Sequence, residues 1–500
     1  MKKFKRRGIA CLSMSLVLMF ALCLGGCNTK DDDNANKPDD STTQTPVDPG
    51  NNKPDDSNKP NNKPEKPEPE PFSVKYREDY KPTKFTSAKN TFSALCDNEG
   101  AMLVANTVTK TNGDVCVVYA IEVDLAKVDI HAGSKDNKTI DYVVGGQIPY
   151  EQSKAWEEAT GGQVYASVNA DFFNPGTGVC VNAFVKDGVI IKSGHNDKGG
   201  YDYTNGDHDV PASAPLLFGV KNGKAQIAPI VKYSGDITSA DVKKPVIQSK
   251  LGYTAKFNGK QSARLGVDVA PTTSEASVLF NTPASMGMGR VMKLDVTGGI
   301  HKLKVLESTV NSSEKTFTPV VGQYAYVLIP TGNSNNIGSA KVGDEISFEV
   351  HSVGGLWNGY DTILGCRHAL VIDDAIPSTV ELENSNGAQR AEIPRTAIGI
   401  KNGKPVIFIV ESLYYYDKAE DGDTHGMSVP ELAEFIYYYG CSQAANFDGG
   451  GSTQLIVRKE GEEKSTVLVR SADYNGEEGK NPATTRPVAN TLLITSKTED

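Results

Sequence analysis

A run of three glycines, Gly449 to Gly451, lies between an acidic residue, Asp448, and a hydroxyl residue, Ser452. Because glycine has no Cβ, the backbone here can adopt positive φ and a ligand can approach the main chain closely. Successive free N–H groups in such a turn can form a concave nest for anionic oxygens. Two interpretations follow: a ligand-binding turn in which Asp448 acts as a base or binds a sugar or a cation, and a plain hairpin turn.

The flanking residues narrow this choice. Ser428 and Glu431 have the spacing of a capping box, and a helical apolar period follows them as far as Gly440. Residues 443–447 and 453–459 are predicted to be strands before and after the glycines. A phosphate-binding P-loop would need a lysine and a helix after its glycines, so a nucleotide site is not expected.

The N-terminal segment indicates the compartment. Basic residues are followed by an apolar run from Ile9 to Leu24 and then by Leu-Gly-Gly-Cys27. This order is typical of a bacterial lipoprotein signal, with cleavage after residue 26 and lipid attached to Cys27. The alternative is an uncleaved transmembrane helix, for which the apolar run is nearly long enough. We therefore expect an exported protein on the extracellular side of the cell membrane, held there by its lipid.

Residues 27–72 are predicted to be a disordered linker, because they are rich in Pro, Asp, Asn and Lys and contain almost no apolar residue. The remaining chain divides into a β-rich lead-in at 73–160 and a larger domain at 161–498. The net charge of −10 argues against nucleic acid as a partner. The sequence does not indicate an oligomeric state.

Five cysteines follow Cys27, an odd number, so at least one is unpaired or pairs between chains. No CxxC, HExxH or histidine cluster is present, so a zinc enzyme has little support. We expect no cofactor, while a divalent cation is left open.

Hydrophobic alternation predicts many strands and few helices. Residues 115–121 and 127–131 are expected to pair, 150–159 to form a helix and 164–170 a strand. Turns are expected at Asp187-Gly188, Asn222-Gly223 and Asn402-Gly403. Residues 279–350 alternate apolar and polar side chains. The predicted fold class is α+β with extensive mixed sheets.

Five motifs occur in order along the chain: Asn169-Ala-Asp-Phe-Phe173, Arg395-Thr-Ala-Ile-Gly399, Gly426-Met-Ser-Val-Pro-Glu-Leu432, Asn446-Phe-Asp-Gly-Gly-Gly-Ser452 and Arg486-Pro-Val-Ala-Asn490. Together they resemble the phosphodiester glycosidase family, with matching segments from Gly162 to Ile494. The resemblance implies one large domain that hydrolyses the bond between a sugar and a phosphodiester. Two places depart from the family pattern: Asp171, where a small residue is usual, and the segment 412–424.

Candidate catalytic residues are carboxylates. Glycosyl transfer passes through an oxocarbenium-like transition state and usually uses two of them. Phosphate is a better leaving group than an alkoxide, so a strong general acid is needed less. Asp448 is the first choice as base or electrostatic stabiliser, with Asp171 and Glu411 as further candidates. Asp171 can instead cap the turn that begins at Asn174.

Candidate substrate-binding residues surround these carboxylates. The planar forks of Arg395 and Arg486 suit a phosphodiester anion, although each alone could form a structural ion pair. Asn169 and Asn490 can bind sugar hydroxyls or cap turns, and Phe173 can stack on a sugar or belong to the core. The family motifs add Thr396, Gly449, Gly450, Gly451 and Ser452.

Two functions remain open at this point. The first is an exported, lipid-anchored hydrolase of a sugar-1-phosphodiester in a surface or environmental glycan. The second is a lipoprotein that binds a phosphoglycan or cell-wall polymer without cleaving it. A carboxylate beside a bound anion favours the enzyme, because a pure binding site would gain nothing from that repulsion. A transporter's solute-binding lipoprotein is disfavoured, since no pair of similar lobes is visible.

Overall fold

A computed structural model describes residues 72–140, 143–194, 216–230, 251–266, 289–312, 314, 324–330, 336–352, 354–377, 392–412, 425–459, 461–473 and 486–497. The signal segment and nearly all of the linker lie outside these ranges, as does most of the segment 412–424. Residues 71–500 group as one compact unit. The boundary between a lead-in and a main domain near residue 160 stays a prediction. No helix in the described ranges is long and apolar enough to cross a membrane.

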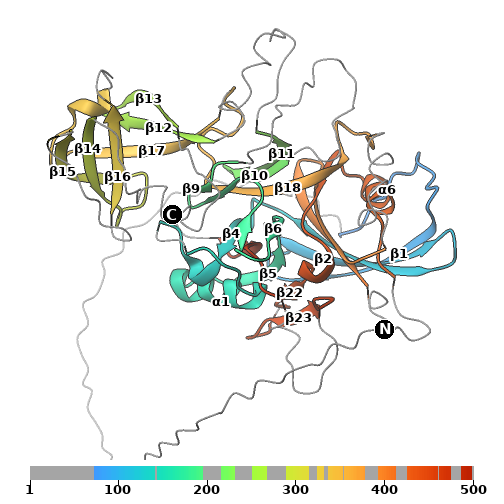
Figure 1. Ribbon diagram of the computed structural model, residues 1–500. Coiled ribbons are helices and arrows are strands. Elements are labelled where there is room, and N and C mark those ends of the chain that lie inside the picture. The colour runs from blue at the N-terminus through green and yellow to red at the C-terminus, as the bar shows by residue number, and fades with distance from the viewer. Residues whose placement is uncertain are drawn as a thin grey trace, which may run out of the picture. The chain divides into compact units, whose positions relative to one another are not determined.

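The described residues form four antiparallel sheets (Figure 1). The first has eleven strands. Nine follow one another in the order β1 (Phe85–Ala94), β2 (Ala101–Lys110), β3 (Val115–Val123), β20 (Lys404–Glu411), β19 (Arg395–Lys401), β21 (Gln443–Asn446), β18 (Thr362–Val371), β10 (Leu216–Lys221) and β11 (Lys224–Pro229). The other two, β8 (Phe184–Lys186) and β9 (Val189–Lys192), join it through β18.

The second sheet has five strands in the order β23 (Thr466–Val469), β22 (Leu455–Val457), β5 (Val164–Asn169), β24 (Asn490–Thr495) and β4 (Asp129–Ser134). The third has six, in the order β13 (Lys260–Gly266), β12 (Gly252–Phe257), β17 (Glu345–His351), β15 (Leu303–Asn311), β14 (Gly289–Asp295) and β16 (Ala325–Pro330). A small hairpin pairs β6 (Phe173–Asn174) with β7 (Val179–Cys180). The β-rich α+β class predicted from the sequence is confirmed.

Successive side chains along the strands of the eleven-stranded sheet point to opposite faces, and both faces are apolar. In β20, Phe408 and Val410 belong to one buried cluster, whereas Ile407 and Ile409 belong to another. The first face carries helix α6 (Val429–Tyr439), which adds Leu432, Phe435 and Ile436 to its cluster. Burial of such large side chains stabilises the fold by about 1.5–3 kcal/mol each.

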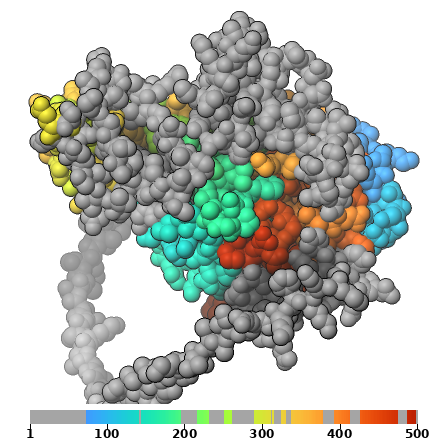
Figure 2. All heavy atoms as spheres, viewed as in Figure 1, coloured from blue at the N-terminus to red at the C-terminus, as the bar shows by residue number. Residues whose placement is uncertain are grey.

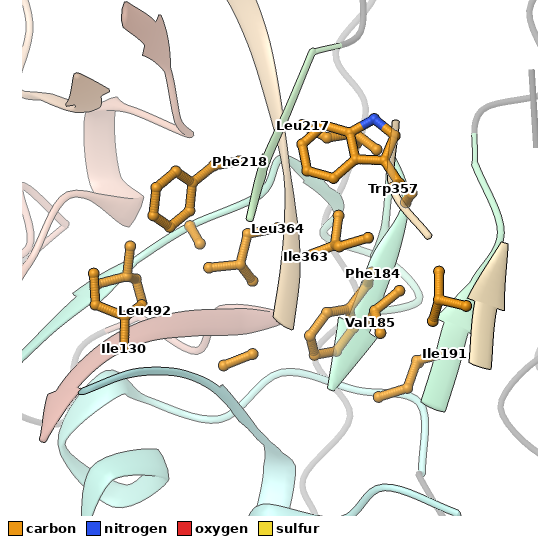
Figure 3. Close-up of a cluster of buried hydrophobic side chains, with 14 of the residues drawn as sticks. Ile130, Phe184, Val185, Ile191, Leu217, Phe218, Trp357, Ile363, Leu364 and Leu492 are labelled. Carbon is orange, nitrogen blue, oxygen red and sulfur yellow. The ribbon is translucent and has the colours of Figure 1, made fainter. Parts of the chain in front are cut away.

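The second face of this sheet packs against the five-stranded sheet. Figure 3 shows part of this core, with Phe218 and Leu364 from β10 and β18 beside Ile130 and Leu492 from β4 and β24. Helix α1 (Pro149–Thr160) covers the outer face of the five-stranded sheet, where Trp156 packs against Val164 and Leu493. The eleven-stranded and five-stranded sheets thus pack face to face between helices α6 and α1. The ends of their strands can therefore contact each other.

Local predictions agree with these elements. The capping box at Ser428 and Glu431 is formed, and Gly440 ends α6 in the left-handed conformation. The predicted turns at residues 187–188, 222–223 and 402–403 each join two strands, with positive φ at both residues. Helix 150–159 and strands 164–170 and 443–447 are found within one or two residues of their predicted bounds. The alternating segment 279–350 contains β14 to β17.

One predicted strand pairing is wrong. The segments 115–121 and 127–131 do not pair with each other, because β3 pairs with β2 and β20 whereas β4 pairs with β24. The strand predicted at 453–459 is found as the shorter β22, which follows a 3-10 turn, η5 (Gly450–Ser452). The five cysteines in the described ranges are all buried, and no disulfide joins any two of them.

Candidate active site

The glycine-rich turn joins the eleven-stranded sheet to the five-stranded sheet. Strand β21 of the first sheet leads into it at Asn446, and β22 of the second sheet follows it at Leu455. The Asp448 N–H donates to Ala170 O at 2.9 Å, just beyond β5, and the Gly450 N–H donates to Pro394 O at 2.8 Å, just before β19. The turn is therefore fixed by the ends of strands from both sheets.

Glycine is required at two positions of this turn for two different reasons. Gly450 has φ +59, the left-handed conformation that most side chains avoid, as the sequence predicts. At Gly451 a Cβ would lie 2.6 Å from the guanidinium Nη1 of Arg486 and 2.3 Å from a carboxylate oxygen of Asp473. Gly450 thus serves the backbone path, and Gly451 leaves room for an ion pair.

The predicted nest of free N–H groups is not formed. The N–H groups of Gly449, Gly450, Ser452 and Thr453 all donate within the protein. The tight 3-10 turn and the close approach of Pro394 account for this. An anion at this turn must be bound by side chains instead.

Asp448 lies partly exposed at the entrance to the turn. Its Oδ1 accepts from the Gly449 N–H at 3.0 Å. Burial raises the pKa of its carboxyl group, although the hydrogen bond from the Gly449 N–H and the positive charges of Arg486 and Arg395 oppose this rise. A carboxyl with a raised pKa is a better proton acceptor than an ordinary aspartate, which suits a general base.

The two predicted arginines lie on different sides of this turn. Arg395 opens β19, is buried, and donates from Nε to Met427 O at 2.9 Å. A Cβ on Gly449 would lie 3.7 Å from its Nη1, so the guanidinium lies against the glycines. Arg486 is more exposed and is bound to Asp473 at 2.6 Å. Its charge is thus already partly neutralised by a carboxylate.

The predicted amides have different surroundings. Asn169 ends β5, and its Oδ1 accepts from the Thr396 hydroxyl while its Nδ2 donates to Asp448 O, both at 2.7 Å. Asn169 and Thr396 therefore orient the turn. Asn490 begins β24, and its Oδ1 accepts from the Asp171 N–H at 3.0 Å. Its Nδ2 is buried without a hydrogen-bond partner in the described residues.

Asp171 is buried next to this arrangement. Its two oxygens accept from the N–H and the side-chain amide of Asn182 at 2.9 and 2.6 Å. Burial raises its pKa to about 7, although Asn182, Lys192 and Arg367 oppose the rise. The turn at Asn174 is closed by the Asn174 carbonyl and side chain instead, so Asp171 does not cap it. Asn182 is a residue that the sequence reasoning missed.

The remaining predicted residues contribute less to the site. Glu411 ends β20, and burial raises its pKa against the charge of Arg470. Phe173 is partly buried against the main core, whereas Phe172 places its ring edge-on to His368 at 6.2 Å. Figure 2 shows that green, orange and red residues, from three distant parts of the sequence, adjoin on one face of the protein.

A cation site has one candidate in the described residues. Asp114, Glu392 and His425 place their ligand atoms within 4.8 Å of one another. Lys110 Nζ lies 2.9 Å from Glu392 and already neutralises it. These residues fit an ion-paired cluster better than a metal site, because a lysine charge repels a cation.

The geometry defines a class of site in which a carboxylate with a raised pKa and arginines meet at the strand ends of two packed sheets. Such a site suits an anionic substrate that requires proton transfer. The sequence matches the model of the phosphodiester glycosidase family over residues 304–495. The resemblance predicted from the motifs is thereby confirmed. Four of the five motifs lie inside the match, and the Asn169 motif lies outside it.

Solved structures give a weaker likeness. A hypothetical protein from Synechocystis matches at 15% identity and a TM-score of 0.44, over 80% of this chain and 62% of that protein. The zebrafish N-acetylglucosamine-1-phosphodiester alpha-N-acetylglucosaminidase catalytic domain, auto-inhibited by its pro-peptide, matches at 12% identity and a TM-score of 0.39, over 82% and 88% of the two chains. Comparison with curated proteins finds no match.

Proposed function

We propose that this protein is a hydrolase that cleaves the bond between a sugar and the phosphate of a sugar-1-phosphodiester. The observation that carries the proposal is that Arg395 and Asp448 lie near each other at the glycine-rich turn, within the stretch that matches the phosphodiester glycosidase family. Arg395 binds the phosphodiester anion, and Asp448 accepts a proton from the attacking water.

The chemistry balances with these groups alone. A water oxygen bonds to the anomeric carbon as the bond from that carbon to the phosphate oxygen breaks, and its proton passes to the Asp448 carboxylate. The electron pair of the broken bond leaves on the phosphate, which becomes a phosphomonoester. Because phosphate carries this charge well, the leaving group needs little protonation, and one basic carboxylate suffices.

The N-terminal sequence extends the proposal to a location. The Leu-Gly-Gly-Cys27 order favours a lipid on Cys27, and residues 27–72 favour a flexible tether on the outer side of the membrane. The substrate would then be a phosphorylated glycan of the cell surface or the surroundings.

The test is a substrate panel. The full chain in detergent is incubated with methyl phosphodiesters of N-acetylglucosamine, glucose, galactose and mannose at C1, with the matching methyl glycosides as controls. Release of sugar from a phosphodiester, and from no methyl glycoside, is the expected result. Retention of the protein on a phosphoglycan without any release would instead favour the binding function.

Arg395→Lys separates substrate binding from chemistry in the same assay. Lysine keeps the charge and loses the planar fork, so KM should rise and inhibition by inorganic phosphate should weaken. Phosphate inhibition equal to that of the unmodified protein would count against Arg395 as the phosphate ligand.

A further inference from the structure

Strand β18 is irregular where it meets β21. Its register shifts between Arg367 and Ala369 and again between Ala369 and Val371. His368, between the first two, has φ +57, which is uncommon for a residue with a side chain. Such bulges re-aim side chains and are frequent beside active sites, where backbone strain is retained for function.

This bulge lies directly after Arg367 and so affects the position of its side chain. Its Nε is buried without a hydrogen-bond partner, and no carboxylate of the described residues forms an ion pair with it. Arg77, Arg458 and Arg486, by contrast, each bind a carboxylate. A buried donor without a partner costs about 1–3 kcal/mol, so a ligand or water at this place is expected.

The register brings Arg367 to the candidate active site. Arg367 lies directly opposite Asn446 in β21, and Asn446 lies directly opposite Ala397 in β19. Opposite residues project from the same face of a sheet, and Arg395, two residues before Ala397, shares that face. The Oδ1 of Asn446, between the two arginines, is also buried without a partner in the described residues.

Strand spacing sets the reach between the two arginines. Two strand intervals of about 4.8 Å and two residues of about 3.4 Å place their Cα atoms roughly 12 Å apart. An arginine side chain extends roughly half that distance, so two guanidinium groups can meet one phosphate between them. The positive charge of Arg367 also acts on Asp171, where it opposes part of the rise in pKa that burial causes.

We propose that Arg367 is a second phosphate-binding residue of this site and acts with Arg395 across β21. The inference deepens the proposed function and rests on it for the identity of the substrate. A phosphodiester is a monoanion with two unesterified oxygens, and one guanidinium on each oxygen holds it in a single orientation. Arg486, bound to Asp473, is then a residue of the rim.

The test measures anion binding without catalysis. Dimethyl phosphate, a diester with no sugar, is titrated calorimetrically into the full chain in detergent, together with Arg367→Gln, Arg367→Lys and the control Arg290→Gln. Arg290 is exposed on β14 and bonds only to Ser308 among the described residues. Arg367→Gln should weaken binding about 10- to 100-fold, the range for a lost charged hydrogen bond. Arg367→Lys should give a smaller loss, and Arg290→Gln no more than about twofold.

Two outcomes would overturn the inference. The first is an unchanged affinity of Arg367→Gln for dimethyl phosphate, or of Arg367→Lys if the Gln variant does not fold. The second is that the unmodified protein does not bind dimethyl phosphate. The sugar-release assay keeps this inference separate from the proposed function. Arg367-dependent binding without sugar release would uphold Arg367 and refute the hydrolase. Sugar release with the same KM in the unmodified protein and in Arg367→Gln would uphold the hydrolase and refute the role of Arg367.

Discussion

At the scale of residues, two carboxyl groups with raised pKa lie at the candidate site in different surroundings. Asp448 is partly exposed and lies near Arg395 and Arg486. Asp171 is buried, and both of its oxygens are held by Asn182. A reacting group must reach the substrate, so the exposed carboxyl suits the chemical step and the buried one suits a positioning role.

Asp448→Asn should lower kcat by roughly 100-fold or more, because it removes the proton acceptor and keeps the size of the side chain. KM should change less. In the unmodified protein kcat/KM should rise with pH as Asp448 ionises, over a range above the ordinary pKa of an aspartate, and the variant should lose this dependence. Asp295→Asn, in the six-stranded sheet, is the control. Near-normal turnover in the variant would move the catalytic carboxylate elsewhere, with Asp171 and Glu411 next to test.

Asp171 predicts a pH dependence of stability. Its pKa of about 7 in the folded protein exceeds the ordinary 3.8, so between these values the folded state binds more protons than the unfolded state. The free energy of unfolding should therefore fall as pH rises from about 4 to about 7, by up to roughly 4 kcal/mol from this group. Urea unfolding at several pH values should show this slope in the unmodified protein and lack it in Asp171→Asn. An identical slope in both would refute the assignment.

At the scale of elements, the turn η5 and helix α6 show two ways in which local sequence sets structure. In η5 one glycine adopts a conformation that other residues avoid, and the next makes room for an ion pair. In α6 a serine and a glutamate bond each other's backbone at the first turn. The first arrangement serves the site, and the second holds the helix that covers the sheet behind it.

Gly450→Val should reduce activity more than it reduces folding. The positive φ at residue 450 makes a β-branched side chain cost about 1–3 kcal/mol, and the turn that carries Asp448 would shift. Gly259→Val is a matched control, since Gly259 has φ +70 and no atom near its Cβ position, in a hairpin of the six-stranded sheet. Thermal unfolding and sugar release are measured for both. Full activity in Gly450→Val would show that the glycine only permits the turn.

Ser428→Ala should destabilise the protein by about 1 kcal/mol, the usual effect of losing an N-cap. The Ser428 hydroxyl accepts from the Glu431 N–H, and the Glu431 side chain accepts from the Ser428 N–H at 2.7 Å. Urea unfolding measures the loss. A loss near zero would mean that water replaces the cap.

At the scale of the whole molecule, the prediction concerns the tether. Cys27→Ala should leave the protein unprocessed or release it from the membrane fraction, because the lipid is attached to that thiol in the proposed lipoprotein. Radiolabelled palmitate incorporation and cell fractionation measure this. Unchanged lipid labelling of the variant would refute the anchor, while leaving the proposed hydrolase unaffected.

The sequence alone determined the features that depend on a few neighbouring residues. The hairpins at residues 187–188, 222–223 and 402–403, the capping box and the positive φ of Gly450 were all predictable, because backbone sterics and short-range hydrogen bonds decide them. The family motifs also located the candidate site residues, but they could not state which of them touch one another.

Only the tertiary structure decided the partners across the chain. It paired β3 with β20 and β4 with β24, gave Arg486 an acidic partner, and placed Asn182 on Asp171. It also brought Arg367 beside the site through a bulge that no local pattern signals. These contacts join residues far apart in sequence. They are selected by the packing of one sheet face against another, a sum over many side chains that no short segment contains.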